Sequence, residues 1–112
     1  MLDNPVSEKR RSRRYELRLP VEILQIGGQP VSVSLQTVNI SSRGALIADP
    51  DEKLRRGQSV EYRIYLPTAS EGAKVYVHCL GAVVRRDATR KAAAVTLQRY
   101  EFVRASAQAA AG

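Results

Sequence analysis

Apolar and polar residues alternate along most of the chain, in short runs separated by turn-forming residues. A period of two residues is typical of half-buried β-strands. The runs predict six strands, at residues 15–23, 31–37, 45–48, 60–66, 74–86 and 92–98. The longest connection, residues 49–58, predicts a polar loop with room for one helical turn. Short strands joined by turns, with no long helix, predict an all-β fold, a small antiparallel barrel.

The pattern also divides the chain into three parts. Residues 1–14 are polar and charged without apolar periodicity, which predicts a flexible basic arm. Residues 15–103 carry the predicted barrel, in which Pro20 indicates an edge position or a bulge and Gly81 a bend or a bulge. The Ala-rich tail, residues 104–112, continues a stretch that favours a short or frayed helix, although Tyr100 and Phe102 also suit an extended last strand.

Composition narrows the class of protein. The 112 residues suffice for one domain, and 44% hydrophobic with 26% charged residues is ordinary for a soluble globular protein. No apolar run approaches the ~20 residues of a transmembrane helix, and the N-terminus lacks the apolar core of a signal peptide. We therefore expect a cytoplasmic protein. The formal net charge of +7 favours anionic partners without choosing among them.

Candidate catalytic and metal-binding residues are few. The single histidine, His78, precedes the single cysteine, Cys79, in an alternating apolar run. One His and one Cys make a poor zinc site, because structural zinc needs about four ligands, and a lone cysteine forms no internal disulfide. The chain has no Walker loop, Ser–His–Asp set or clustered carboxylate pair. The sequence predicts no metal site and no enzyme.

Two motifs suggest binding chemistry. The stretch "EKRRSRRYEL", residues 8–17, holds Arg10 and Arg14 four positions apart, a spacing that places both on one face of a strand or of a helix. Guanidinium groups bond phosphate oxygens in pairs, stack on flat rings and pair with the O6 and N7 edge of guanine. Such a run alone also fits a solvated tail or a non-specific polyanion patch.

The second motif is the turn "NISSRG", residues 39–44. Asn39 and Ser41 have side chains that hold turns by bonding nearby backbone groups. Gly44 allows a positive φ or the close approach of a ligand. On its own, this turn also fits a plain connection between strands.

Together the two motifs resemble the PilZ domain family. The resemblance rests on Arg10-x-x-x-Arg14 before the first strand and Asn39-x-Ser41-x-x-Gly44 after the second, with "GAVVRRD" and "AAAVTL" resembling the family's later strands. It covers residues 8 to about 103. PilZ domains are bacterial receptors for cyclic di-GMP on a six-stranded antiparallel barrel, which implies that fold and ligand here.

The resemblance also implies roles for individual residues. Arg10 and Arg14 would clamp guanine faces, guanine edges and phosphates of cyclic di-GMP. Asn39 and Ser41 would bond a guanine edge and a phosphate, while Gly44 lets the backbone approach. Many members have Asp where this chain has Asn39, so one neutral carbonyl replaces a charged acceptor; binding should survive, with room for a lower affinity.

Neighbouring basic residues extend the candidate site. Along an extended arm Arg11 and Arg13 point away from the face that Arg10 and Arg14 share, and they either add phosphate contacts or stay in solvent; Arg43, inside the turn, is a further candidate for a phosphate contact. Arg85 and Arg86 end a predicted strand, so at most one of them should face the ligand. Lys9 precedes the Arg motif, and in this family the residue there is thought to influence whether one ligand or a stacked pair binds.

We therefore expect a receptor whose arm orders over cyclic di-GMP and which relays the signal to a downstream protein partner, as a monomer or weak dimer. Two alternatives stay open. A small basic barrel that binds nucleic acid fits the charge, but one Phe, five Tyr and no Trp supply few stacking platforms. A PilZ-like adaptor that binds protein and no nucleotide would typically lack the Arg motif.

Overall fold

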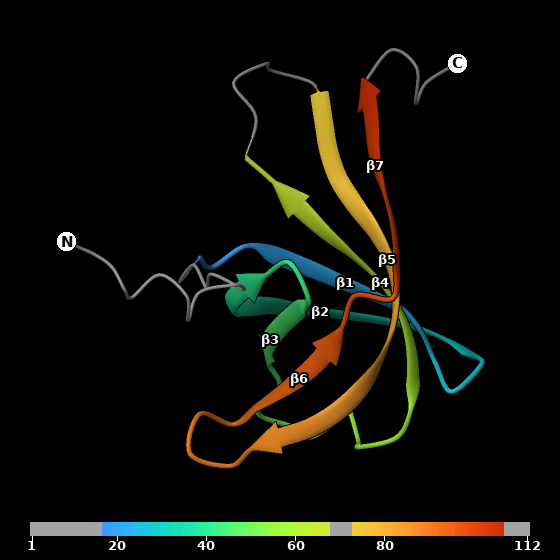
Figure 1. The fold of residues 1–112 in the computed structure, drawn as a ribbon. Helices are drawn as coiled ribbons and strands as arrows, with labels where there is room; N and C mark the ends of the chain where they lie inside the picture. Colours follow the sequence, from blue (N-terminus) through green and yellow to red (C-terminus); the bar gives the residue numbers. More distant parts are fainter. Residues whose placement is uncertain (1–16, 68–72, 107–112) are drawn as a thin grey trace, which may run out of the picture.

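The computed structural model describes residues 17–67 and 73–106 of the chain. This part of the chain forms seven β-strands and no helix (Figure 1). The strands are β1 (Pro20–Ile26), β2 (Gln29–Ser41), β3 (Gly44–Ala48), β4 (Ser59–Leu66), β5 (Ala73–Asp87), β6 (Ala92–Thr96) and β7 (Arg99–Ser106). The six strands predicted from the hydrophobic alternation are present, and one further strand follows them.

Six of the strands close into a barrel. Their order is β4-β1-β2-β3-β6-β5, and the additional pairing of β4 with β5 joins the two ends. Every pairing is antiparallel. β7 lies outside this ring and pairs with β5 along residues Ala73 to Leu80. In Figure 1 the outer ends of β4, β5 and β7 rise above the barrel as a three-stranded sheet.

The core is aliphatic, as the sparse aromatic content predicts. Alternate residues of the strands point inward, as expected from the period of two. The core includes Val21, Ile23, Ile47, Leu54, Tyr62, Ile64, Val83 and Val95, each at most 4% exposed. Cys79 and Tyr62 lie inside it, and burial raises the pKa of the Cys79 thiol to about 11. Burial also raises the pKa of the Tyr62 hydroxyl.

Gly81 marks the position where β5 changes its neighbour. Before it, Leu80 pairs with Arg99 of β7, and after it, Val83 pairs with Val95 of β6. A Cβ at Gly81 would lie 1.8 Å from the backbone oxygen of Thr96, where β6 ends. Only glycine fits against a backbone this close. The bulge expected near Gly81 lies slightly further on, because the register with β6 shifts between Val83 and Arg85.

Both ends of the described chain differ from the prediction. Leu17, Arg18 and Leu19 are not part of a strand, and β1 begins at Pro20, a residue tolerated at the first position of a strand; residues 15 and 16 lie outside the described residues. The short helix expected after residue 103 is wrong for Val103–Ser106, which continue β7; residues 107–112 lie outside the described residues. Pairing with the free edge of β5 outweighs the helix propensity of alanine, which is worth only fractions of a kcal/mol per residue.

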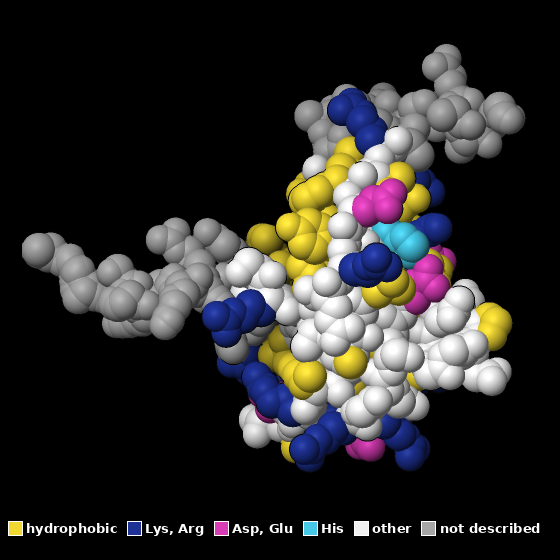
Figure 2. All heavy atoms as spheres, turned by 45° about the vertical axis from the view of Figure 1, so that its right-hand side comes forward, with side chains coloured by type: hydrophobic (Ala, Val, Ile, Leu, Met, Phe, Trp, Pro, Cys, Tyr) yellow, Lys and Arg dark blue, Asp and Glu magenta, His cyan; other side chains and the backbone are white. Residues whose placement is uncertain are grey.

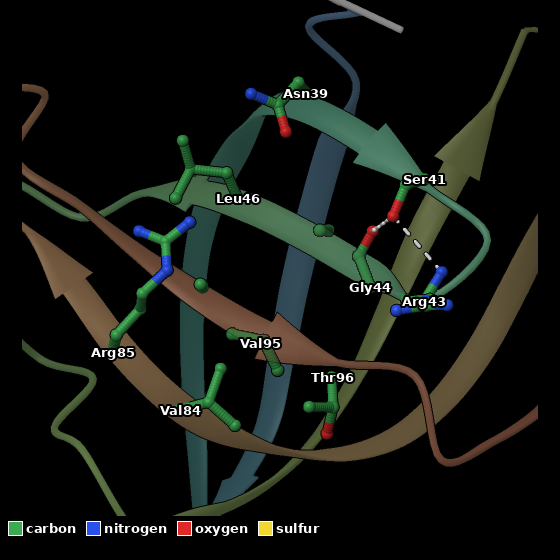
Figure 3. A pocket seen from close by; sticks show the side chains of 11 residues that line it. Asn39, Ser41, Arg43, Gly44, Leu46, Val84, Arg85, Val95 and Thr96 are labelled. Atoms are coloured by element: carbon green, nitrogen blue, oxygen red, sulfur yellow. Dashed lines mark hydrogen bonds between the residues drawn. The ribbon is translucent and has the colours of Figure 1, made fainter. Parts of the chain in front are cut away.

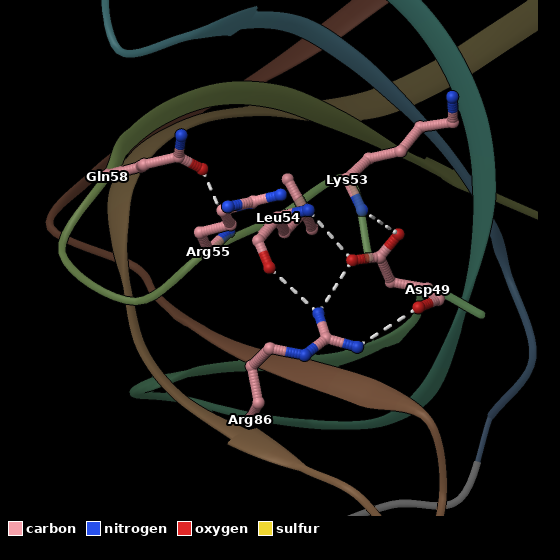
Figure 4. A network of polar contacts seen from close by, with 6 residues as sticks. All are labelled: Asp49, Lys53, Leu54, Arg55, Gln58 and Arg86. Atoms are coloured by element: carbon pink, nitrogen blue, oxygen red, sulfur yellow. Dashed lines mark hydrogen bonds and ion pairs between the residues drawn. The ribbon is translucent and has the colours of Figure 1, made fainter. Parts of the chain in front are cut away.

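The loop between β3 and β4 is organised by one buried carboxylate. Asp49 is fully buried and accepts hydrogen bonds from the backbone N of Lys53 and Leu54, at 2.9 and 2.8 Å (Figure 4). Arg86 completes the network: its Nη1 lies 2.7 Å from Asp49 Oδ2 and 2.8 Å from the carbonyl oxygen of Leu54. The network holds Leu54 in the core, and the loop forms no helical turn.

His78 and Cys79 are neighbours on β5 and therefore point to opposite faces of the sheet. His78 Nε2 lies 2.6 Å from Glu61 Oε2, whereas Cys79 is fully buried. Within residues 17–67 and 73–106, no group of three or more potential metal ligands occurs. No helix in this part of the chain could cross a membrane.

Candidate functional site

The predicted binding turn lies at the end of β2 and the start of β3. Ser41, the last residue of β2, pairs with Gly44, the first residue of β3. The hydroxyl of Ser41 accepts a hydrogen bond from the backbone N of Arg43 at 3.2 Å and donates one to the carbonyl oxygen of Gly44 at 3.5 Å (Figure 3). Ser41 thus holds the turn in the way that its residue type predicts.

Gly44 has a packing role that the sequence did not reveal. A Cβ at this position would lie 2.2 Å from the backbone oxygen of Val95 on β6. The glycine therefore lets β3 pack closely against its neighbour, in addition to any approach by a ligand.

A bulge in β2 turns Asn39 toward the outer surface. Thr37 pairs with Ile47, a core residue, but Asn39 pairs with Leu46, because the register shifts between Thr37 and Asn39. One extra residue in a strand reverses the face on which the following side chains lie. Thr37 is therefore buried in the barrel, whereas Asn39, two residues later, lines a surface pocket.

This pocket, about 400 Å³ in volume, brings the predicted turn residues together with two other strands (Figure 3). Asn39, Ser41, Arg43 and Gly44 line it from β2, β3 and the turn between them. Val84 and Arg85 line it from β5, and Val95 and Thr96 from β6. The pocket combines amide, hydroxyl and guanidinium groups with an apolar floor, which suits a ligand that has both flat and charged parts.

Arg85 is a further residue of the pocket, which the sequence alone did not assign to the ligand side. Strand alternation predicts that only one of Arg85 and Arg86 faces a given side. In the structure Arg85 lines the pocket, with its guanidinium directed toward Leu46 (Figure 3), while Arg86 bonds Asp49 beneath the loop. Val84, 48% exposed, was also missed, because a β-branched residue in an apolar run carries no binding signal.

The three arm residues Arg10, Arg11 and Arg14 lie outside the described residues, so their position relative to the pocket is not described. The described chain begins at Leu17, and Thr37 fixes it there. The Thr37 hydroxyl accepts a hydrogen bond from Leu19 N at 2.9 Å and donates one to the carbonyl oxygen of Leu17. Thr37 N also donates to Leu19 O at 2.9 Å. The base of the arm is thereby attached to β2 two residues before Asn39.

These features define a class of protein: a small closed β-barrel with a polar and cationic pocket on its outer surface. Comparison with known families identifies the class further. The family model described as PilZ domain matches residues 8–110, nearly the whole chain. The chain belongs to the PilZ domain family. No curated protein matches it.

Proposed function

We propose that this domain is a receptor for cyclic di-GMP. In this proposal the ligand binds in the surface pocket that Asn39, Ser41 and Arg85 line, and the basic arm covers it. The observation that carries the proposal is the bulge between Thr37 and Asn39, because it places Asn39 in one pocket with Ser41 and Arg85. The family to which the chain belongs supports the choice of ligand.

The chemistry of the pocket matches that of the ligand. Cyclic di-GMP is a dianion that carries two guanines. Arg43 and Arg85 supply two cations for phosphate oxygens or the guanine edge. Asn39 supplies an amide for a guanine edge, Ser41 a hydroxyl for a phosphate, and Val84 an exposed apolar surface against which a base can pack.

In this proposal the arm supplies the remaining contacts. Arg10 and Arg14 bind guanine and phosphate, and Arg11 adds a phosphate contact. Arg14 precedes Leu17 by three residues, so an extended chain keeps its Cα within about 10 Å of the attachment formed by Thr37. Ligand binding then orders the arm over the barrel and creates the surface that a protein partner recognises.

The proposal is tested by calorimetric titration of the protein with cyclic di-GMP, with GTP and with a short DNA duplex. We expect saturable heat with cyclic di-GMP alone, and a loss of roughly ten- to a hundredfold in affinity for Arg14→Ala, since one charge-assisted hydrogen bond is worth about 1.5–3 kcal/mol. Arg56→Ala is the matched control, because Arg56 is an exposed arginine on the loop between β3 and β4. Absence of heat with cyclic di-GMP would refute the proposal, and salt-dependent heat with DNA would favour a nucleic-acid-binding barrel.

Two further measurements separate the parts of the site. Asn39→Asp should bind cyclic di-GMP more tightly than the native protein, because a charged carboxylate accepts from guanine N1 and N2 more strongly than an amide does. Trypsin cleavage after Arg10 to Arg14 should slow when the ligand is present. If cleavage is equally fast with saturating ligand, the arm does not order over it.

A further inference from the structure

A second hollow lies on the other side of the β2–β3 turn. It has a volume of about 300 Å³ and lies between the β2–β3 turn and the β4–β5–β7 sheet. Its apolar lining includes Ile40, Ile64, Leu66, Val77, Tyr100 and Phe102. In Figure 2, hydrophobic side chains gather along one flank of the projecting part of the molecule. We call this hollow the β7 groove.

Two aromatic side chains dominate the exposed rim of the β7 groove. Tyr100 is 57% exposed and Phe102 is 68% exposed, and their ring centroids lie 6.0 Å apart in an edge-to-face arrangement. Scattered exposed apolar residues are common, but an exposed aromatic pair beside an apolar hollow is typical of an interaction surface.

β7 also presents a free strand edge. Among the described residues it pairs only with β5, so its other edge exposes a row of backbone N–H and C=O groups. Natural edge strands usually carry charged residues, proline or a bulge that prevent further pairing. β7 has the sequence RYEFVRAS, with three charged residues but no lysine or proline, and its ladder with β5 shows no register shift.

We propose that two copies of this chain associate along β7, pairing the two strands antiparallel about a twofold axis so that Phe102 lies opposite Phe102 of the second copy. In this register Tyr100 lies opposite Arg104 of the second copy on the apolar face, where a guanidinium stabilises an aromatic ring. On the other face Glu101 lies opposite Val103, and nearly all of β7 is paired.

Two other symmetric registers, centred on Glu101 and on Tyr100, are less favourable, and the disulfide test below distinguishes the proposed register from the one centred on Val103. Centring the pairing on Glu101 places two carboxylates directly opposite each other, which is destabilising. Centring it on Tyr100 leaves the second half of β7 opposite residues that precede the strand. The arrangement with Phe102 at the centre joins the two β7 grooves into one continuous apolar surface, of which Tyr100 and Phe102 are exposed among the described residues of a single copy.

Sedimentation velocity, run without nucleotide from low micromolar to several hundred micromolar protein, tests the association. We expect a concentration-dependent monomer–dimer equilibrium, weakened about tenfold or more by Phe102→Ser, as for a central aromatic residue of an interface. Leu80→Ser is the control, because Leu80 is 40% exposed but its neighbour Cys79 is buried, so Leu80 points to the opposite face of the same sheet. A wild-type chain that stays monomeric throughout, or equal weakening by both variants, would overturn the proposal.

A disulfide test checks the register. Side chains directly opposite in an antiparallel pair have Cβ atoms about 4.5–5.5 Å apart, close to the spacing of a disulfide. Phe102→Cys should therefore cross-link two copies quickly under mild oxidation, and Leu80→Cys should not. The native Cys79 is fully buried and stays out of the reaction. Cross-linking that is no faster for Phe102→Cys than for Leu80→Cys would contradict this pairing.

Discussion

Replacing Thr37 by valine separates the attachment of the arm from the binding pocket itself. Thr37 is fully buried, and its hydroxyl bonds the backbone of both Leu17 and Leu19. Valine has nearly the same shape but neither donates nor accepts a hydrogen bond. The substitution therefore releases the side-chain bonds at the base of the arm and leaves the side chains that line the pocket unchanged.

The expected loss of stability follows from the bonds that disappear. Each of the two hydrogen bonds contributes about 1 kcal/mol, and the Leu19 N–H left without its acceptor costs about 1 kcal/mol more. The bond from Thr37 N to Leu19 O survives, since it involves only the backbone. The free energy of unfolding should fall by about 2–3 kcal/mol, measured by urea denaturation, which a domain with ~5–15 kcal/mol of stability survives.

The effect on binding distinguishes a positioning role from a purely structural one. An arm that is less firmly attached loses more conformational entropy when the ligand orders it. We therefore expect the affinity for cyclic di-GMP to fall by roughly three- to tenfold. In a chain that already carries alanine at Arg10, Arg11 and Arg14, adding Thr37→Val should have little further effect, because the contacts that the attachment positions are gone.

Tyr62→Phe is the control for this experiment. It removes a buried hydroxyl that donates to Thr96 O at 2.8 Å and so also destabilises the barrel, but it does not touch residues 17–19. If Thr37→Val binds cyclic di-GMP as tightly as the native chain, or no more weakly than Tyr62→Phe does, the reasoning is refuted.

Three further predictions concern stability. Asp49→Asn should lower the free energy of unfolding by about 3–5 kcal/mol in urea denaturation, because it leaves Arg86 without its buried partner; a change below about 1 kcal/mol would mean that the ion pair is dispensable. Gly44→Ala should lower the thermal unfolding midpoint by several degrees, since its Cβ would meet Val95 O at 2.2 Å. The Cys79 thiol, with a pKa raised from 9.0 to about 11, holds its proton in the folded state where the unfolded chain has lost it. Stability should therefore fall by up to about 1.4 kcal/mol per unit between pH 9 and 11, and less steeply in Cys79→Ala.

Hydrophobic alternation was sufficient to predict the barrel. Residues such as Val21, Ile23, Tyr62 and Ile64 occupy every second position and are buried, so six strands and their approximate limits followed from the sequence. The last strand was harder to predict. The alternation in "RYEFVRAS" indicates a strand, whereas the alanine-rich residues that follow favour a helix. Pairing with the edge of β5 decides in favour of the strand, and β5 lies far from these residues in the sequence.

The site was only partly accessible to sequence reasoning. The turn residues could be named from their types and spacing, but the side of the barrel that Asn39 faces depends on a bulge that no residue type indicates. Strand alternation predicts that the side chains of Arg85 and Arg86 lie on opposite faces, but it does not tell which of them lines the pocket. Asp49 was taken for part of a polar loop, although Leu54, an isolated apolar residue in that loop, was a signal that the segment is held against the core.

The β2–β3 turn is a wall common to two hollows. Ser41 and Gly44 line the polar pocket on one side and the β7 groove on the other. Any molecule that shifts this turn when it fills one hollow changes the shape of the other, and thermodynamic linkage requires the influence to be equal in both directions. Occupancy of the β7 groove would then alter the affinity of the polar pocket by the same factor by which a ligand in that pocket alters association at the groove. A turn of four residues would in this way couple a ligand in the polar pocket to association at the β7 groove.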